Sequence, residues 1–97
     1  MIEHIVLFKW KPETSPEQIA AAITGLQRLK TAIPGIVDLS CGQNFCDRAQ
    51  GFQTALVVRF TDRNALETYQ PHPAHQAVVH TLIKPIAADI LAVDFEI

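Results

Sequence analysis

The fold of this chain is decided by the stretch Ile2-Glu3-His4-Ile5-Val6-Leu7-Phe8-Lys9-Trp10, which reads as a β-strand. Successive side chains of a strand point to opposite faces, so the even-numbered residues share one face, and Ile5 and Leu7 lie on the other. Both faces are apolar in the middle, and each therefore needs a cover. Helices on one side of a small sheet supply only one cover, so the sequence predicts a second cover of another kind.

The first helix carries clear start and stop signals. The run Ser15-Pro16-Glu17-Gln18 places a serine at the N-cap, a proline at the first helical position and a glutamine three residues on, as in a capping box. Apolar residues then recur at helical spacing up to Ile33, and Pro34-Gly35 should end the helix. Gly25 interrupts this stripe at a cost of about 1 kcal/mol relative to alanine, so it marks either a close-packing point or a weak spot.

The rest of the chain predicts three more strands and two more helices. We expect strands over residues 36–46, 52–61 and 90–97, and a polar turn over 47–51. Asp62 can cap a short helix that ends at Tyr69, and Pro73 can open another that Pro85 ends or kinks. The order β-α-β-β-α-α-β predicts one α+β domain over residues 1–97, a ferredoxin-like subunit with an antiparallel sheet. A second copy packed face to face on the uncovered side would complete a homodimer.

The composition limits the classes of function that are possible, but it does not identify one. The 97 residues are 48% hydrophobic and 19% charged, which is typical of one globular domain. A net charge of −2 gives no basic surface for nucleic acid, and no apolar run is long enough for a membrane span, so we expect a cytoplasmic protein with neither partner. Cys41 and Cys46 lack the spacing of a metal or redox motif and are expected to be reduced thiols.

The segment Tyr69-Gln70-Pro71-His72-Pro73-Ala74-His75 gathers a phenol and two imidazoles around a stiff corner. Each proline disfavours the α region for the residue before it, so Gln70 and His72 should be extended. His72 then suits an N-cap position better than a catalytic role. The corner could hold reactive groups in place, or it could be only a rigid joint between two helices.

His75 is the candidate general base, with Tyr69 as its partner. His75 should lie in the first turn of a helix, where the dipole disfavours imidazolium and keeps the ring neutral. Tyr69 could orient this ring or donate to a developing enolate oxygen. The alternative is that His75 only caps the helix or bonds a nearby backbone carbonyl.

The opening stretch and the corner segment together resemble the two signatures of the stress-responsive dimeric α/β-barrel (Dabb) family, over essentially the whole chain. The resemblance implies a ferredoxin-like subunit that dimerises through its sheets, and it implies no single activity. Members include plant stress proteins without an agreed reaction and a plant polyketide cyclase. In that cyclase, residues matching His4, Tyr69 and His75 line a pocket between sheet and helices. A further pocket tyrosine on its first helix is replaced here by Leu26.

Two functions follow as alternatives. The first is a stress-associated homodimer that binds a small apolar or aromatic ligand without chemistry. The second is a cofactor-free cyclase or lyase working by acid–base chemistry at Tyr69 and His75. An enclosed pocket with these two side chains in mutual hydrogen-bond reach favours the enzyme, and a filled interior favours the first function.

The remaining candidate residues are expected to contact a ligand rather than to react. They are His4, His72, Phe8 and Trp10, and the alternative for His4, Phe8 and Trp10 is a place in the core or an interface. No cofactor is expected, and a zinc site from His4, His72 and His75 is disfavoured because nothing in the sequence requires three imidazoles at one point. His80 should be exposed, and Asp94 and Glu96 should form a solvated carboxylate pair on one strand face.

Overall fold

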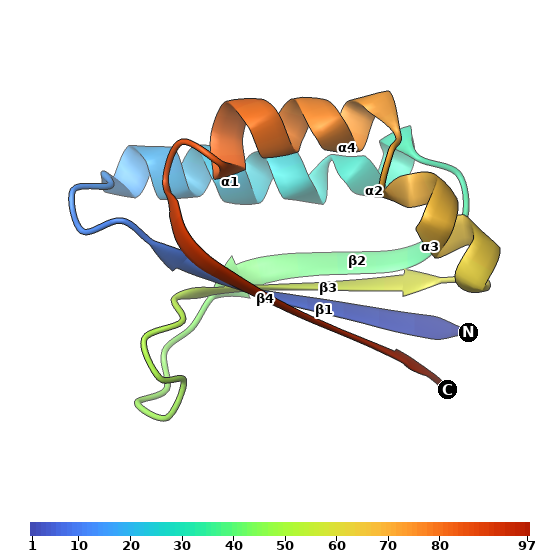
Figure 1. Ribbon diagram of the computed structural model, residues 1–97, viewed down its shortest axis with the longest axis horizontal. Helices are drawn as coiled ribbons and strands as arrows, with labels where there is room; N and C mark the ends of the chain where they lie inside the picture. The colour runs from blue at the N-terminus through green and yellow to red at the C-terminus, as the bar shows by residue number, and fades with distance from the viewer.

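A computed structural model describes residues 1–97 and has one antiparallel sheet covered by helices on one face (Figure 1). The strand order is β2-β3-β1-β4, as expected for the ferredoxin-like α+β fold. The elements in chain order are β1 (Ile2–Trp10), α1 (Pro16–Gln27), α2 (Leu29–Ala32), β2 (Ile36–Gln43), β3 (Thr54–Phe60), α3 (Arg63–Tyr69), α4 (Pro73–Val78), the π-helical turn η1 (Val79–Ile83) and β4 (Ala87–Glu96).

The predicted helix starts are confirmed by their hydrogen bonds. The Ser15 hydroxyl accepts from the Gln18 backbone N–H, and the Gln18 side chain accepts from the Ser15 N–H, which completes the capping box of α1. Asp62 caps α3 by accepting from the Ala65 N–H at 2.8 Å. The first helix is not continuous to Ile33, because a turn at Arg28 separates α1 from α2, and Ile33 lies just beyond α2 as a buried residue.

The ends of β2, β3 and β4 differ by one to three residues from the expectation. β2 ends at Gln43, because the Asn44 side chain bonds both the N–H and the carbonyl of Cys46 and replaces the ladder with a local turn. Residues 44–53 therefore form an arm between β2 and β3, which hangs below the sheet in Figure 1. β4 begins earlier than predicted, at Ala87, because its pairing with β1 extends to Trp10.

The helices on the sheet pack closely where Gly25 faces η1. A Cβ added to Gly25 would lie 2.6 Å from Leu82 Cδ1, so glycine lets α1 and η1 approach. The Lys84 N–H reaches the Val79 carbonyl at 2.8 Å, five residues back, which is the wide hydrogen bond of a π-helical turn. Gly25 is therefore the close-packing point, one of the two expected alternatives.

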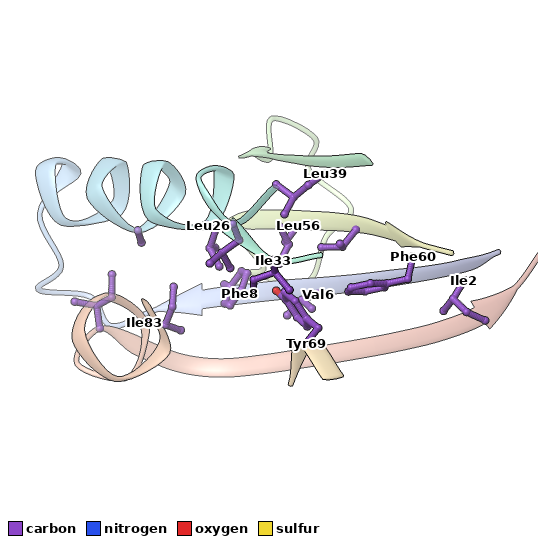
Figure 2. Close-up of a cluster of buried hydrophobic side chains, with 14 of the residues drawn as sticks. Ile2, Val6, Phe8, Leu26, Ile33, Leu39, Leu56, Phe60, Tyr69 and Ile83 are labelled. Atoms are coloured by element: carbon purple, nitrogen blue, oxygen red, sulfur yellow. The ribbon is translucent and has the colours of Figure 1, made fainter. Parts of the chain in front are cut away.

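The core fills the space between the helices and the sheet face that they cover, which we call the closed face. Figure 2 shows side chains from β1, β3 and the helices meeting there, among them Val6, Phe8, Leu56, Phe60 and Tyr69. The opposite surface, the open face, has no helix over it (Figure 1). By strand register, its apolar residues are Ile5, Leu7, Ala55, Val57, Leu91, Val93 and Phe95.

Candidate functional site

A cavity of about 190 Å³ lies between the closed face and the helices. Twelve residues line it, and four of these carry polar groups: His4 from β1, Tyr69 from α3, Gln70 just after it, and His75 from α4. The others are apolar, among them Leu26 of α1. A larger, more open hollow of about 470 Å³ beside residues 40–46 contains no histidine or tyrosine. The chemistry-bearing residues thus gather at the smaller, helix-covered cavity.

Tyr69 is fully buried, and its hydroxyl has no hydrogen-bond partner. The side chain reaches from α3 into the core, with the hydroxyl oxygen at its inner end (Figure 2). Its ring packs edge-on against Phe60 at 5.0 Å between centroids. Burial, with a smaller contribution from Cys41, raises the pKa of Tyr69 well above its usual range. Tyr69 is therefore a neutral donor that finds no acceptor in the protein.

The His75 ring is fixed by the carbonyl of Gln70. His75 Nδ1 lies 2.9 Å from this oxygen, and because a carbonyl only accepts, Nδ1 carries the proton of the neutral ring. Nε2 is then the nitrogen with the free lone pair. Burial is the largest cause that lowers the pKa of His75, the hydrogen bond to Gln70 opposes it, and the charges of His4 and His72 add to the lowering. Burial is thus the main cause that favours the neutral imidazole.

Gln70 is not extended as the sequence suggested, although it precedes a proline. Its φ of −55° and ψ of −51° continue α3, and its N–H bonds the Leu66 carbonyl at 3.2 Å. The Gln70 carbonyl also accepts from Gln76 Nε2 at 2.7 Å, in addition to His75. Hydrogen bonds to residues four to six positions away therefore accompany a helical Gln70 in spite of the following proline, and its carbonyl points at the candidate base.

His4 is bound to Asp94, a partner that the sequence analysis missed. The two residues face each other in the β1–β4 register, and His4 Nδ1 contacts Asp94 Oδ1. Asp94 and Glu96 share one face of β4 and are both exposed, as expected, but each has a partner: His4 for Asp94, and Arg63 at 3.2 Å for Glu96. The alternation of β4 could have indicated the contact, because His4 and Asp94 both fall on the closed face.

Of the predicted ligand contacts, His4 and Phe8 line the cavity, and Trp10 and His72 do not. Trp10 stacks on Phe8 with centroids 5.1 Å apart and donates its Nε1–H to Thr54 Oγ1 at 2.9 Å. His72 caps α4, since its Nδ1 accepts from the Ala74 N–H at 3.1 Å. This is the N-cap role expected for it from the two prolines. His80 is exposed, as expected.

The two sequence criteria for an enzyme are met only in part. A cavity is present, and the Tyr69 and His75 rings contact each other with centroids 4.3 Å apart. No hydrogen bond joins them: His75 bonds the Gln70 carbonyl through Nδ1, and the Tyr69 hydroxyl is unpaired. The residues that line the cavity thus include one unpaired donor, the buried Tyr69 hydroxyl, and one free acceptor, His75 Nε2.

No group of three or more His, Cys, Asp or Glu side chains is arranged to hold a metal ion. None of the helices combines the length and the apolar character that crossing a bilayer requires.

Comparison with known proteins identifies the family. The chain is 33% identical over 96 residues to a stress-response A/B barrel domain-containing protein of Arabidopsis thaliana, and these residues are 98% of this chain but only 36% of that protein. It is 32% identical over 98 residues to an uncharacterized protein of Streptomyces coelicolor, spanning 99% of each.

A solved structure and a family pattern agree with these relatives. A dimeric ferredoxin-like protein of unknown function from Thermobifida fusca superimposes with a TM-score of 0.88 and 33% identity, over 99% of this chain and 90% of the other. The sequence pattern of the Stress responsive A/B Barrel Domain matches residues 2–97. The chain therefore belongs to the stress-responsive A/B barrel (Dabb) domain family.

Proposed function

We propose that this Dabb domain works as a homodimer in which each subunit binds a small molecule in the cavity beneath its helices. The main observation in favour of a bound ligand is the Tyr69 hydroxyl. This hydroxyl is fully buried and has no hydrogen-bond partner, and it belongs to a residue that lines the cavity. Leaving a buried polar group unpaired costs about 1–3 kcal/mol, so a ligand that accepts this hydrogen bond stabilises the protein. The apolar lining supplies the remaining contact area.

The proposal of a homodimer is based on the open face of the sheet. Leu91, Val93 and Phe95 stand side by side on this face of β4, and each is about half exposed. A continuous apolar strip of this kind marks an interaction surface, and a second copy is the simplest closed cover. The Thermobifida fusca relative, described as dimeric, supports this assignment.

Acid–base catalysis is the second candidate, and one observation favours it. His75 is neutral with Nε2 free to accept a proton, as a general base requires. We rank this candidate below ligand binding for two reasons. Tyr69 and His75 share no hydrogen bond, and Leu26 replaces the helix tyrosine of the cyclase.

Two measurements test the proposal. Light scattering at micromolar concentration should give twice the subunit mass of 10.7 kDa, and a monomer would contradict the dimer. A ligand-observed NMR screen of small aromatic compounds should find binders whose signals compete for one site. The Leu26→Trp substitution, which fills the cavity, should abolish this binding, whereas Ala20→Trp on the exposed surface of α1 should not.

A further inference from the structure

The open face of the sheet carries large side chains at one edge and small ones at the other, and the inference drawn from this rests on the homodimer proposed above. At the β4 edge, Leu91 and Val93 are each about half exposed, and we call these two side chains the ridge. The strand register places Ala55 of β3 and Gly42 of β2 at the same level of the sheet as Leu91. The face is therefore raised along β4 and low over β2.

The low region is the open hollow of about 470 Å³ beside residues 40–46. A Cβ added to Gly42, which lines it, would meet no atom within 4 Å. None of the nine lining residues carries a charge, so an apolar group can enter the hollow without desolvating one. A cavity of roughly 150 Å³ holds a benzene molecule, and the hollow therefore has room for both side chains of a ridge.

The arm between β2 and β3 forms one wall of this hollow, on the side of the sheet away from the helices (Figure 1). Its base is held in place by the sheet. The Lys9 ammonium lies 4.6 Å from the centre of the Phe52 ring, and the Gln53 N–H bonds the Phe8 carbonyl at 2.8 Å. Phe45, in the same arm, is nevertheless fully exposed. An aromatic ring presented in this way by an anchored segment is typical of an interface anchor.

A two-fold axis parallel to the strands brings the ridge of each subunit over the hollow of its partner. This axis exchanges the two edges of the sheet and preserves the level along the strands, so Leu91 meets the partner's Gly42. The arm begins directly after Gln43, which is level with Ile90, and this brings Phe45 beside the partner's Leu91. An axis across the strands would instead stack ridge on ridge and leave both hollows empty.

We propose that the two subunits interlock, with the ridge of each seated in the hollow of its partner and Phe45 of each arm packed on the partner's Leu91. The Gly42→Leu variant tests the hollow. Its added Cβ meets no atom of its own subunit, so urea denaturation of dilute protein should show unchanged stability. Its side chain occupies the space of the partner's ridge, and the dimer dissociation constant should rise about tenfold or more in equilibrium ultracentrifugation. Ala20→Leu, on the exposed surface of α1, is the matched control.

The Phe45→Ala variant tests the arm. The ring is fully exposed in the subunit, so its removal should leave the stability of dilute protein unchanged. Burying half of such a ring contributes about fivefold in affinity, and each dimer contains two, so the dissociation constant should rise roughly 25-fold. Arg48→Ala shortens another exposed side chain of the same arm and should change the constant less than about twofold.

A mixed dimer reports the contact directly, whatever its affinity. One isotope-labelled and one unlabelled subunit are refolded together, and isotope-filtered NMR should show a nuclear Overhauser effect from the Phe45 ring of one to the Leu91 methyl groups of the other.

The outcomes separate the interlock from the homodimer. A wild type that sediments as a monomer contradicts both. If the wild type is a dimer and Gly42→Leu associates as tightly or more tightly, the extra apolar surface has helped, and the seating of the ridge in the hollow is overturned while the homodimer stands. Unchanged affinity in Phe45→Ala, or no effect between Phe45 and Leu91 in the mixed dimer, overturns the inference in the same way.

Discussion

The two faces of the sheet are both apolar in the middle, and they are very different in exposure. Leu56 on the closed face is 2% exposed, whereas Leu91 on the open face is 47% exposed. Both are leucines in strands that pair directly with β1. The difference arises from the helices, which cover one face and leave the other without a cover (Figure 1). Strand periodicity therefore shows on which face of the sheet a residue lies, but not what covers that face.

The two faces also contribute to stability in different ways. The closed face is buried within one subunit, so its contribution to folding does not depend on protein concentration. The open face contributes only when a second copy binds, and its contribution therefore rises with concentration by mass action. Substitutions on the two faces can be distinguished by this dependence.

The largest effect is expected from truncating a leucine on the closed face. Leu56→Ala should lower the free energy of unfolding by about 2–5 kcal/mol at every protein concentration, because it leaves a cavity in the core. Leu91→Ala should cost less than about 1 kcal/mol in dilute protein and more in concentrated protein, where the open face is covered. Urea denaturation at two concentrations measures both, and equal losses in dilute protein would contradict the distinction between the faces.

A charge on the open face should break the dimer without unfolding the subunit. Val93→Asp places a carboxylate in the middle of the apolar strip, and we expect the dimer dissociation constant to rise on the order of 100-fold or more, because the buried charge has no partner. Light scattering would show the mass falling to 10.7 kDa, while circular dichroism stays unchanged. Ala20→Asp on the exposed surface of α1 is the control. A Val93→Asp protein that stays dimeric would show that another surface forms the interface.

The smallest expected effect is a pH dependence of the folding stability, which arises from His75 over the closed face. The folded-state pKa of His75 is lowered from 6.5, so the unfolded chain takes up a proton first as the pH falls. The stability associated with the neutral ring is complete above pH 6.5 and is lost as the pH drops through the folded-state pKa. Urea denaturation at pH 7.5, 6.5 and 5.5 should show this loss in the wild type.

The slope with pH, rather than the absolute stability, is the readout for His75. His75→Gln should flatten the loss of stability below pH 6.5, since no ring remains to take up the proton. His80→Gln should leave the slope unchanged, because His80 is exposed. An unaltered slope in the His75→Gln protein would assign the pH dependence to another group.

Much of the fold could be predicted from local signals. The capping box at Ser15, the Asp62 cap and the two prolines around His72 act through hydrogen bonds and backbone sterics within a few residues, and each is found where expected. One prediction failed where other nearby hydrogen bonds compete with such a preference. Gln70 stays helical before a proline because its carbonyl serves His75 and Gln76.

The candidate site was predictable only in its parts. His4, Phe8, Tyr69 and His75 were singled out from the sequence and all line one cavity, whereas Trp10 and His72 are used to stabilise neighbouring elements. Asp94 was missed, because it lies 90 positions from His4 and only strand register brings the two together. The register depends on the pairing of the whole strands rather than on any local motif.

By itself, the sequence determined the order of the elements, their capped ends and the presence of apolar residues on both faces of β1. These properties depend on backbone geometry and side-chain periodicity, which are local. The tertiary structure alone decided that the Tyr69 hydroxyl is buried without a partner, that His75 is held by a carbonyl, and that a cavity of about 190 Å³ remains between them and the sheet. Burial, pairing and volume are set by how distant elements pack together, and no single stretch of the chain specifies them.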